Sequence, residues 1–256
     1  MAEYLRDKRI LTTRPTMHAD TWSALLRAAG AEVDCIPMLA INPLVEVSAL
    51  QAIKNRILDF DQTDLAIFVS QNAVRYGVDW LEDYWPQLPQ GPRYYAIGAA
   101  TAKALLARGI PCERSGESMN SEDLLALPSL RQVAGQHVLI FRGAGGRTLI
   151  GDTLLARGAQ VRYCELYQRS LPTGATDQLQ DYAFTPDAIT VHSGETLANL
   201  HRCIEQSGCE RLLHPPLIGP SARVAKQARA LGFTETHTAL NAGDSAMLEA
   251  LSQALV

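Results

Sequence analysis

Short apolar runs alternate with amphipathic segments along the chain. Residues 65–69 and 137–141 are mostly apolar runs, and residues 9–12 contain an apolar pair; their length and composition predict strands. A segment with apolar residues three or four positions apart follows each run, and this spacing predicts a helix. Alternating strands and helices with short connections predict parallel, doubly wound sheets, so we expect an α/β fold.

One sequence pattern occurs twice along the chain. Residues 95–109 and 217–232 each read as an apolar strand end, a glycine turn, a hydroxyl residue, an alanine-rich helix and a closing glycine. Thr101 and Ser221 are the hydroxyl residues, and we expect them to cap the first turn, whose N–H groups lack partners within the helix. The closing glycines suit C-terminal caps. Such helix starts bind anions, because free N–H donors and the positive dipole end coincide.

Two further units recur in the same order. The strand, helix, glycine and strand of residues 9–36 return at 137–164, and the strand and turn of 65–74 return at 188–197. The first pair starts at Arg9 and His137, 128 residues apart, which is half the chain length of 256. Four recurring sequence features in the same order indicate that an α/β half-molecule was duplicated.

The polar residues of these units fall where strands end. Ligands bind outside the carboxyl ends of the strands in doubly wound sheets. The set offers backbone N–H groups, hydroxyls and guanidinium groups without a strong acid–base pair, so we expect an anionic ligand. The predicted ligand-binding residues are Thr13, Arg14, Ser70, Asn72, Gly98, Thr101, Arg142, Ser193, Gly194, Gly219 and Ser221.

Composition narrows the range of partners. The net charge of −4 gives no global reason to expect nucleic-acid binding. The first residues carry no signal region, and no apolar run approaches the ~20 residues of a membrane helix, so we expect a cytoplasmic protein without a membrane partner. Five cysteines without a C-x-x-C pair indicate reduced, mostly buried thiols. The six histidines lack metal-ligand spacing, so no metal is expected.

Taken together, the motifs resemble the uroporphyrinogen-III synthase (HemD) family over essentially the whole chain. The residues that carry the resemblance are the turn 68–74, Ile97–Gly98 with Thr101, Tyr167 and the turn 218–221. The resemblance implies two flavodoxin-like, doubly wound parallel-sheet lobes joined by a two-stranded connector. The implied division is residues 1–37 plus 172–256 for a discontinuous first lobe, 43–166 for the second, and 38–42 and 167–171 for the connectors.

The resemblance also implies a reaction. It is a dehydrative cyclisation of hydroxymethylbilane, a linear tetrapyrrole, with inversion of ring D to give uroporphyrinogen III in haem biosynthesis. We expect a monomeric lyase without a cofactor. Tyr167 is the implied proton donor for the departing hydroxyl group, and Thr101 is the second catalytic candidate. Because every pyrrole carries an acetate and a propionate, the substrate is a polyanion that suits the donor-rich strand ends.

Two other functions stay open at this point. Residues 143–148 follow a strand and open a helix, which partly matches the dinucleotide fingerprint, but Thr148 stands where the third glycine belongs. A non-catalytic two-lobed module that binds an acidic small molecule would carry the same donors. Individual residues also have structural interpretations: Tyr167 as a packing residue, Arg14 and Arg142 as solvated strand ends, and His192 as a hydrogen-bonded structural histidine.

Overall fold

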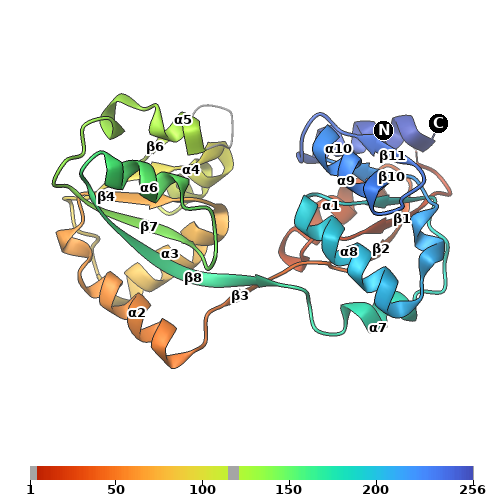
Figure 1. Ribbon diagram of the computed structural model, residues 1–256, viewed down its shortest axis with the longest axis horizontal. Coiled ribbons are helices and arrows are strands. Elements are labelled where there is room, and N and C mark those ends of the chain that lie inside the picture. Colours follow the sequence, from red (N-terminus) through yellow and green to blue (C-terminus); the bar gives the residue numbers. More distant parts are fainter. Residues whose placement is uncertain (1–4, 115–120, 256) are drawn as a thin grey trace. The chain divides into compact units, whose positions relative to one another are not determined.

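The chain forms two compact units, and the first is built from two segments that flank the second in sequence. The computed structural model describes residues 5–114 and 121–255. The first unit combines the residues up to Ala40 with those from Ser170 onward, and the second unit is Ile41–Arg169. The chain crosses between the units in strands β3 (Ala40–Pro43) and β8 (Gln160–Ser170), which are neighbours in one sheet (Figure 1).

The first unit is a parallel five-stranded sheet with helices on both faces. Its strand order is β11-β10-β9-β1-β2. Numbered along this unit alone, the order is 2-1-3-4-5, which is the flavodoxin-like arrangement. The strands are β1 (Arg9–Thr12), β2 (Glu32–Cys35), β9 (Ala188–Thr190), β10 (Leu217–Gly219) and β11 (Thr236–Thr238). The helices are α1 (Thr16–Ala28), α7 (Ala175–Gln180), α8 (Gly194–Ser207), η3 (Glu210–Leu213), α9 (Ala222–Ala230) and α10 (Asp244–Leu255).

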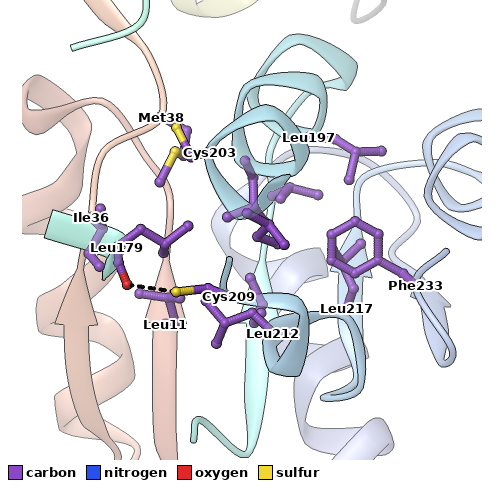
Figure 2. Close-up of a cluster of buried hydrophobic side chains, with 14 of the residues drawn as sticks. Leu11, Ile36, Met38, Leu179, Leu197, Cys203, Cys209, Leu212, Leu217 and Phe233 are labelled. Carbon is purple, nitrogen blue, oxygen red and sulfur yellow. Dashed lines mark hydrogen bonds between the residues drawn. The ribbon is translucent and has the colours of Figure 1, made fainter. Parts of the chain in front are cut away.

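Side-chain alternation along the strands builds two cores in this unit. Ile10 packs on the face covered by α1 and α10, in a cluster with Trp22 and Leu251. The next residue, Leu11, points to the opposite face, which α7, α8 and α9 cover. Figure 2 shows this second cluster, in which the Cys209 thiol donates to the Leu179 carbonyl over 3.5 Å.

The cysteines match the expectation of reduced, mostly buried thiols. All five are free, and Cys164, Cys203 and Cys209 are buried. Cys35 is exposed and Cys112 is half-buried, since they lie at the end of β2 and just before β6.

The second unit has the same architecture with one added edge strand. Its strand order is β3-β8-β7-β4-β5-β6, and β8, β7, β4, β5 and β6 are parallel. The other strands are β4 (Leu65–Phe68), β5 (Arg93–Ala96), β6 (Glu113–Arg114) and β7 (His137–Gly143). The helices are α2 (Val47–Leu58), η1 (Phe60–Gln62), α3 (Gln71–Tyr84), α4 (Gly98–Ala107), α5 (Ser121–Leu125), η2 (Pro128–Leu130) and α6 (Leu149–Ala156). Helices α2, α3 and α4 share one core, and α5 and α6 share the other.

The strand register agrees with the sequence repeat. Arg9 pairs with Glu32 between β1 and β2, and His137 pairs with Gln160 between β7 and β8, so both partners move by 128 residues. The strand pair β1–β2 joins β9, β10 and β11, which belong to the second repeat, whereas β7–β8 joins β4, β5 and β6 of the first. Each unit therefore combines the start of one repeat with the remainder of the other.

The prediction that Thr101 and Ser221 are equivalent capping residues is wrong for Thr101. The closing glycines do end their helices in the left-handed region, with φ of 73° at Gly109 and 91° at Gly232. They lie 123 residues apart, and this offset aligns Ser221 with Gly98 instead. Ser221 caps α9 by accepting from the Val224 N–H over 3.4 Å. Thr101 is buried inside α4, which Gly98 starts with a φ of 77° and without a side-chain cap.

Two general features of the described residues bear on function. No helix among them is long and apolar enough to cross a membrane. In the same residues, no three His, Cys, Asp or Glu side chains gather closely enough to hold a metal ion.

Candidate active site at the carboxyl edge of the second sheet

Tyr167 enters the site through an irregularity in β8. Along β7 and β8, Arg142 pairs with Glu165 but Gly143 pairs with Tyr167, so β8 contains one extra residue at this point. The Tyr167 side chain is 6% exposed, and its ring lies 5.7 Å from that of Tyr76, measured between centroids. A Cβ atom on Gly143 would come within 2.5 Å of the Tyr167 ring, so glycine permits this close approach.

The Tyr167 hydroxyl is hydrogen-bonded to the residue that caps a helix. Its oxygen lies 2.9 Å from the Ser70 Oγ, and either hydroxyl can donate. Ser70 is the N-cap of α3, where its Oγ also accepts from the Ala73 N–H over 3.1 Å. The positive end of the α3 dipole therefore lies beside the phenol.

Arg142 is buried and holds the loop that follows β7. Its side chain is 6% exposed, its Nε donates to the Gly143 carbonyl and its Nη1 to the Arg147 carbonyl, both over 3.2 Å. The guanidinium carbon lies 4.8 Å from the centre of the Tyr163 ring. Burial raises the pKa of Tyr163, while the nearby Arg142 charge opposes that rise. A Cβ atom on Gly146 would overlap the guanidinium group, so glycine lets the loop lie against Arg142 in this position.

A cavity of about 390 Å³ lies beside these residues within the second unit. It is polar, with three arginines and two tyrosines in its wall, and Ile140 and Ile150 supply part of an apolar floor. The lining residues are Val69, Ile97, Ser121, Ile140, Arg142, Gly143, Gly146, Arg147, Ile150, Tyr163, Tyr167 and Arg169.

The structure brings some predicted residues together and leaves others apart. Ser70 and Tyr167 share a hydrogen bond, and Tyr167 and Arg142 line the same cavity. Asn72 is half-buried on the first turn of α3, and Thr101 is buried in α4; neither is among the cavity-lining residues. Gly98 starts α4 directly after Ile97, which does line the cavity.

The cavity residues that sequence reasoning missed include two arginines and a tyrosine. Arg147 lies in the loop after β7, Tyr163 lies in the middle of β8, and Arg169 lies near its end. These residues lie close in sequence to Arg142 or Tyr167, which was the available signal. The polar pattern of residues 160–170 did not show that they form one long strand, so their common side of the sheet was not evident.

The first unit carries a second group of predicted residues at its own carboxyl edge. The Thr13 hydroxyl donates to the Thr190 carbonyl over 2.9 Å. Arg14 pairs with Asp244, with 2.6 Å between Nη1 and Oδ1. Ser193 caps α8, which begins at Gly194, by accepting from the Thr196 N–H over 3.1 Å. The Ser221 cap of α9 follows Gly219, the last residue of β10.

His192 lies in the short loop between β9 and α8, and it differs from the hydrogen-bonded histidine expected there. Both ring nitrogens are buried, and neither has a hydrogen-bond partner among the described residues. The ring meets that of Trp22 edge-on, with 5.3 Å between centroids. Burial, and then the charge of Arg14, lower the His192 pKa to about 3. The imidazole is therefore neutral at physiological pH and poorly suited to act as a base.

The fold and these two edges define an α/β protein that presents hydroxyls, helix starts and guanidinium groups at the carboxyl ends of its strands. Comparison with known proteins identifies the family. The family model for uroporphyrinogen-III synthase HemD matches residues 20–249. The chain therefore belongs to the uroporphyrinogen-III synthase HemD family, and the interpretation of residues 143–148 as a dinucleotide fingerprint is set aside.

Bacterial relatives cover nearly the whole chain. The uroporphyrinogen-III synthase of Escherichia coli K12 is 38% identical over 249 residues, covering 94% of this chain and 99% of that protein. The Salmonella typhimurium enzyme of the same name is 36% identical over 246 residues, with the same coverage.

Solved structures confirm the fold class. A mutant uroporphyrinogen III synthase from the extremely thermophilic bacterium Thermus thermophilus matches with a TM-score of 0.66 at 19% identity, covering 97% of this chain and 98% of that one. The Helicobacter pylori 26695 enzyme matches with a TM-score of 0.59 at 17% identity, covering 97% and 100%. At these identities the likeness speaks for the fold alone.

Proposed function

We propose that the chain catalyses the reaction of its family, the dehydrative cyclisation of hydroxymethylbilane to uroporphyrinogen III with inversion of ring D. Family membership over residues 20–249 supports the reaction. The observation that carries the assignment of the site is the Tyr167 phenol, nearly buried beside a cavity and hydrogen-bonded to the cap of α3. No cofactor is needed, because the electron-rich pyrroles drive the departure of the hydroxyl group.

In the first step, the substrate loses its hydroxyl group. Tyr167 gives its proton to the hydroxymethyl oxygen as the C–O bond breaks, and water leaves. The electron pair of the pyrrole nitrogen stabilises the azafulvenium carbon that remains. The phenolate of Tyr167 then accepts a hydrogen bond from Ser70 and lies at the positive end of α3.

In the second step, the protein controls which carbon closes the ring. The substituted carbon of ring D attacks the azafulvenium carbon to give the hindered spiro intermediate, which opens and recloses with ring D inverted. The proton released when the last pyrrole regains aromaticity restores the Tyr167 phenol. The main contribution of the protein is to hold a flexible chain in the productive conformation.

Substrate carboxylates are assigned to the donor groups of both sheet edges. In the second unit these are Arg142, Asn72 and the helix starts at Ser70 and Gly98, while Thr101 stays a candidate for a supporting catalytic role. In the first unit the proposed contacts are Thr13, Arg14, Ser193, Gly194, Gly219 and Ser221. A helix start supplies both N–H donors and a favourable dipole for each carboxylate.

Isomer analysis tests the proposed function. Purified protein is incubated with hydroxymethylbilane, and the products are oxidised to porphyrins and resolved. Type III should predominate, whereas the reaction without protein gives type I. Type I alone, formed at the spontaneous rate, would overturn the proposal. Saturable substrate binding without turnover would instead support a non-catalytic binding module. Light scattering during size-exclusion chromatography tests the expected monomer.

A further inference from the structure

A smaller cavity lies at the opposite edge of the second sheet, where its strands begin. Its volume is about 280 Å³, and its wall is formed by the carboxyl end of α2, the residues just before β4 and the first residues of β7 and β8. This volume is close to the lower limit of the ~300–1,000 Å³ that is typical of small-molecule sites. The linear tetrapyrrole of the proposed reaction is too large for it, so the cavity suits a different and more compact ligand.

Arg56 brings an unmatched charge to this cavity. It lies in the last turn of α2 and is half-buried, and its Nε is fully buried without a hydrogen-bond partner among the described residues. Burial raises the pKa of the Cys164 thiol to about 12, and the nearby Arg56 charge opposes that rise, so the guanidinium group lies close to β8. A buried donor of a charged group is costly when it lacks a partner, which indicates that a ligand completes its contacts.

The other charges around the cavity are matched. Arg162 pairs with Asp59, with 3.3 Å between Nη1 and Oδ2. The His137 Nδ1 lies 3.6 Å from the Asp64 Oδ2. The carboxyl end of the α2 dipole offsets part of the Arg56 charge. In the described wall of the cavity, the balance therefore suits a ligand with one negative charge.

The remaining polar groups define the kind of anion. A carboxylate accepts two parallel N–H bonds from a guanidinium group. Phosphate carries more than one negative charge at neutral pH, which the neighbouring Asp59 disfavours. Thr63 is buried in the wall, and Gln62 and Gln160 add side-chain amides that can donate and accept. These groups suit a hydroxyl or another polar substituent on a small acid.

We infer that this cavity is a binding site for a small monocarboxylate, with the carboxylate on Arg56 and polar substituents toward Thr63, Gln62 and Gln160. The inference goes beyond the proposed function and does not depend on it. A ligand that binds only the folded protein also stabilises it, so occupancy of this cavity stabilises the second unit.

A titration with lactate, a monocarboxylate that carries a hydroxyl group, tests the site. In amide NMR spectra of the full-length protein, saturable shifts should gather at residues 56–63, 137–139 and 160–162. Arg56→Met should raise the dissociation constant about tenfold or more, because a charge-assisted contact is lost. Lys54→Met is the matched control, since Lys54 is an exposed cation of the same helix outside the cavity wall, and it should bind lactate like the unmodified protein.

Thermal melting without ligand separates binding from a structural role. If Arg56 is kept for a ligand, Arg56→Met removes an unmatched buried charge and should melt at the same temperature or higher. If Arg56 serves only the carboxyl end of α2, the variant should melt at a lower temperature and bind lactate unchanged, which would overturn the inference.

Three further outcomes would also overturn it. Lactate shifts confined to the edge that carries Tyr167 would place the ligand in the other cavity. Tighter binding of inorganic phosphate than of lactate, lost in Arg56→Met, would assign the cavity to a phosphate ligand. A raised KM for hydroxymethylbilane in Arg56→Met would assign it to a substrate carboxylate. Failure of the proposed reaction would leave the lactate titration unaffected, so the two failures can be told apart.

Discussion

The contact between Gly143 and Tyr167 makes the site sensitive to a single methyl group. In Gly143→Ala, the new Cβ would come within 2.5 Å of the Tyr167 ring, so the ring must move away from its place beside Ser70. We expect kcat to fall by at least tenfold, because small displacements of a catalytic group are costly. Steady-state assays with hydroxymethylbilane measure the effect.

Gly91→Ala is the control for this change. Nothing lies within 4 Å of a Cβ atom at Gly91, so that variant should keep the activity of the unmodified protein. A Gly143→Ala protein with the same kcat as Gly91→Ala would show that the position of the Tyr167 ring does not limit the reaction.

The buried imidazole of His192 should make the stability of the first unit depend on pH. Its folded pKa is lowered to about 3, whereas an unfolded histidine titrates near 6.5. The unfolded state therefore binds the proton first, and stability is lost as pH falls below about 6.5, until the folded pKa is reached. From pH 7 to pH 4.5 this one group should remove roughly 2–3 kcal/mol of unfolding free energy.

The variant His192→Leu isolates that contribution. It removes the titrating ring but keeps an apolar side chain next to Trp22. Urea unfolding at pH 7 and pH 4.5 should show a smaller loss of stability on acidification than in the unmodified protein. Equal losses in the two proteins would mean that His192 is not the buried, neutral imidazole described above.

At the level of elements, the cap of α3 links helix stability to catalysis. Ser70→Ala removes the acceptor for the Ala73 N–H and the partner of Tyr167. We expect a loss of about 1 kcal/mol in unfolding free energy together with a lower kcat. Ser70→Thr retains a capping hydroxyl and should recover both quantities. If Ser70→Ala loses stability but keeps kcat, the hydroxyl is only a cap.

The strands and helices could be predicted better than the site details. Alternation of apolar residues with helical spacing predicted the α/β class, and the closing glycines at 109 and 232 were placed correctly. The Thr101 cap was wrong because Gly98 itself turns the chain into α4 with positive φ. The extra residue in β8 could not be predicted, since Leu166 and Tyr167 are both buried and local alternation does not show which one pairs with β7.

At the level of the whole molecule, the repeat explains the architecture but not the chemistry. The offset of 128 residues aligns Tyr167 with Leu39, so only one repeat carries the phenol. The sequence could not show that each unit combines parts of both repeats, because hydrophobic periodicity describes a strand without naming its neighbours. Arg147 and Arg169 were missed for a related reason: they become neighbours of one cavity only after the sheet has formed.

The second unit should fold by itself. Residues 41–169 are continuous in sequence, have the usual size of a domain and contain both of their hydrophobic cores. We expect the excised fragment to melt cooperatively and to give a dispersed amide NMR spectrum. A fragment without a cooperative transition would show that the second unit needs the first for its stability.

The most direct test of the account is the substitution Tyr167→Phe. The ring and its packing remain, so thermal stability should be nearly unchanged. Loss of the phenolic proton should lower kcat by about 10²-fold, at the low end for a general acid, because this hydroxyl leaves readily and water can substitute. The fraction of type I isomer should rise at fixed protein concentration, since spontaneous closure then competes. A Tyr167→Phe protein with unchanged kcat and an unchanged ratio of type III to type I would contradict the assignment of Tyr167 as the proton donor.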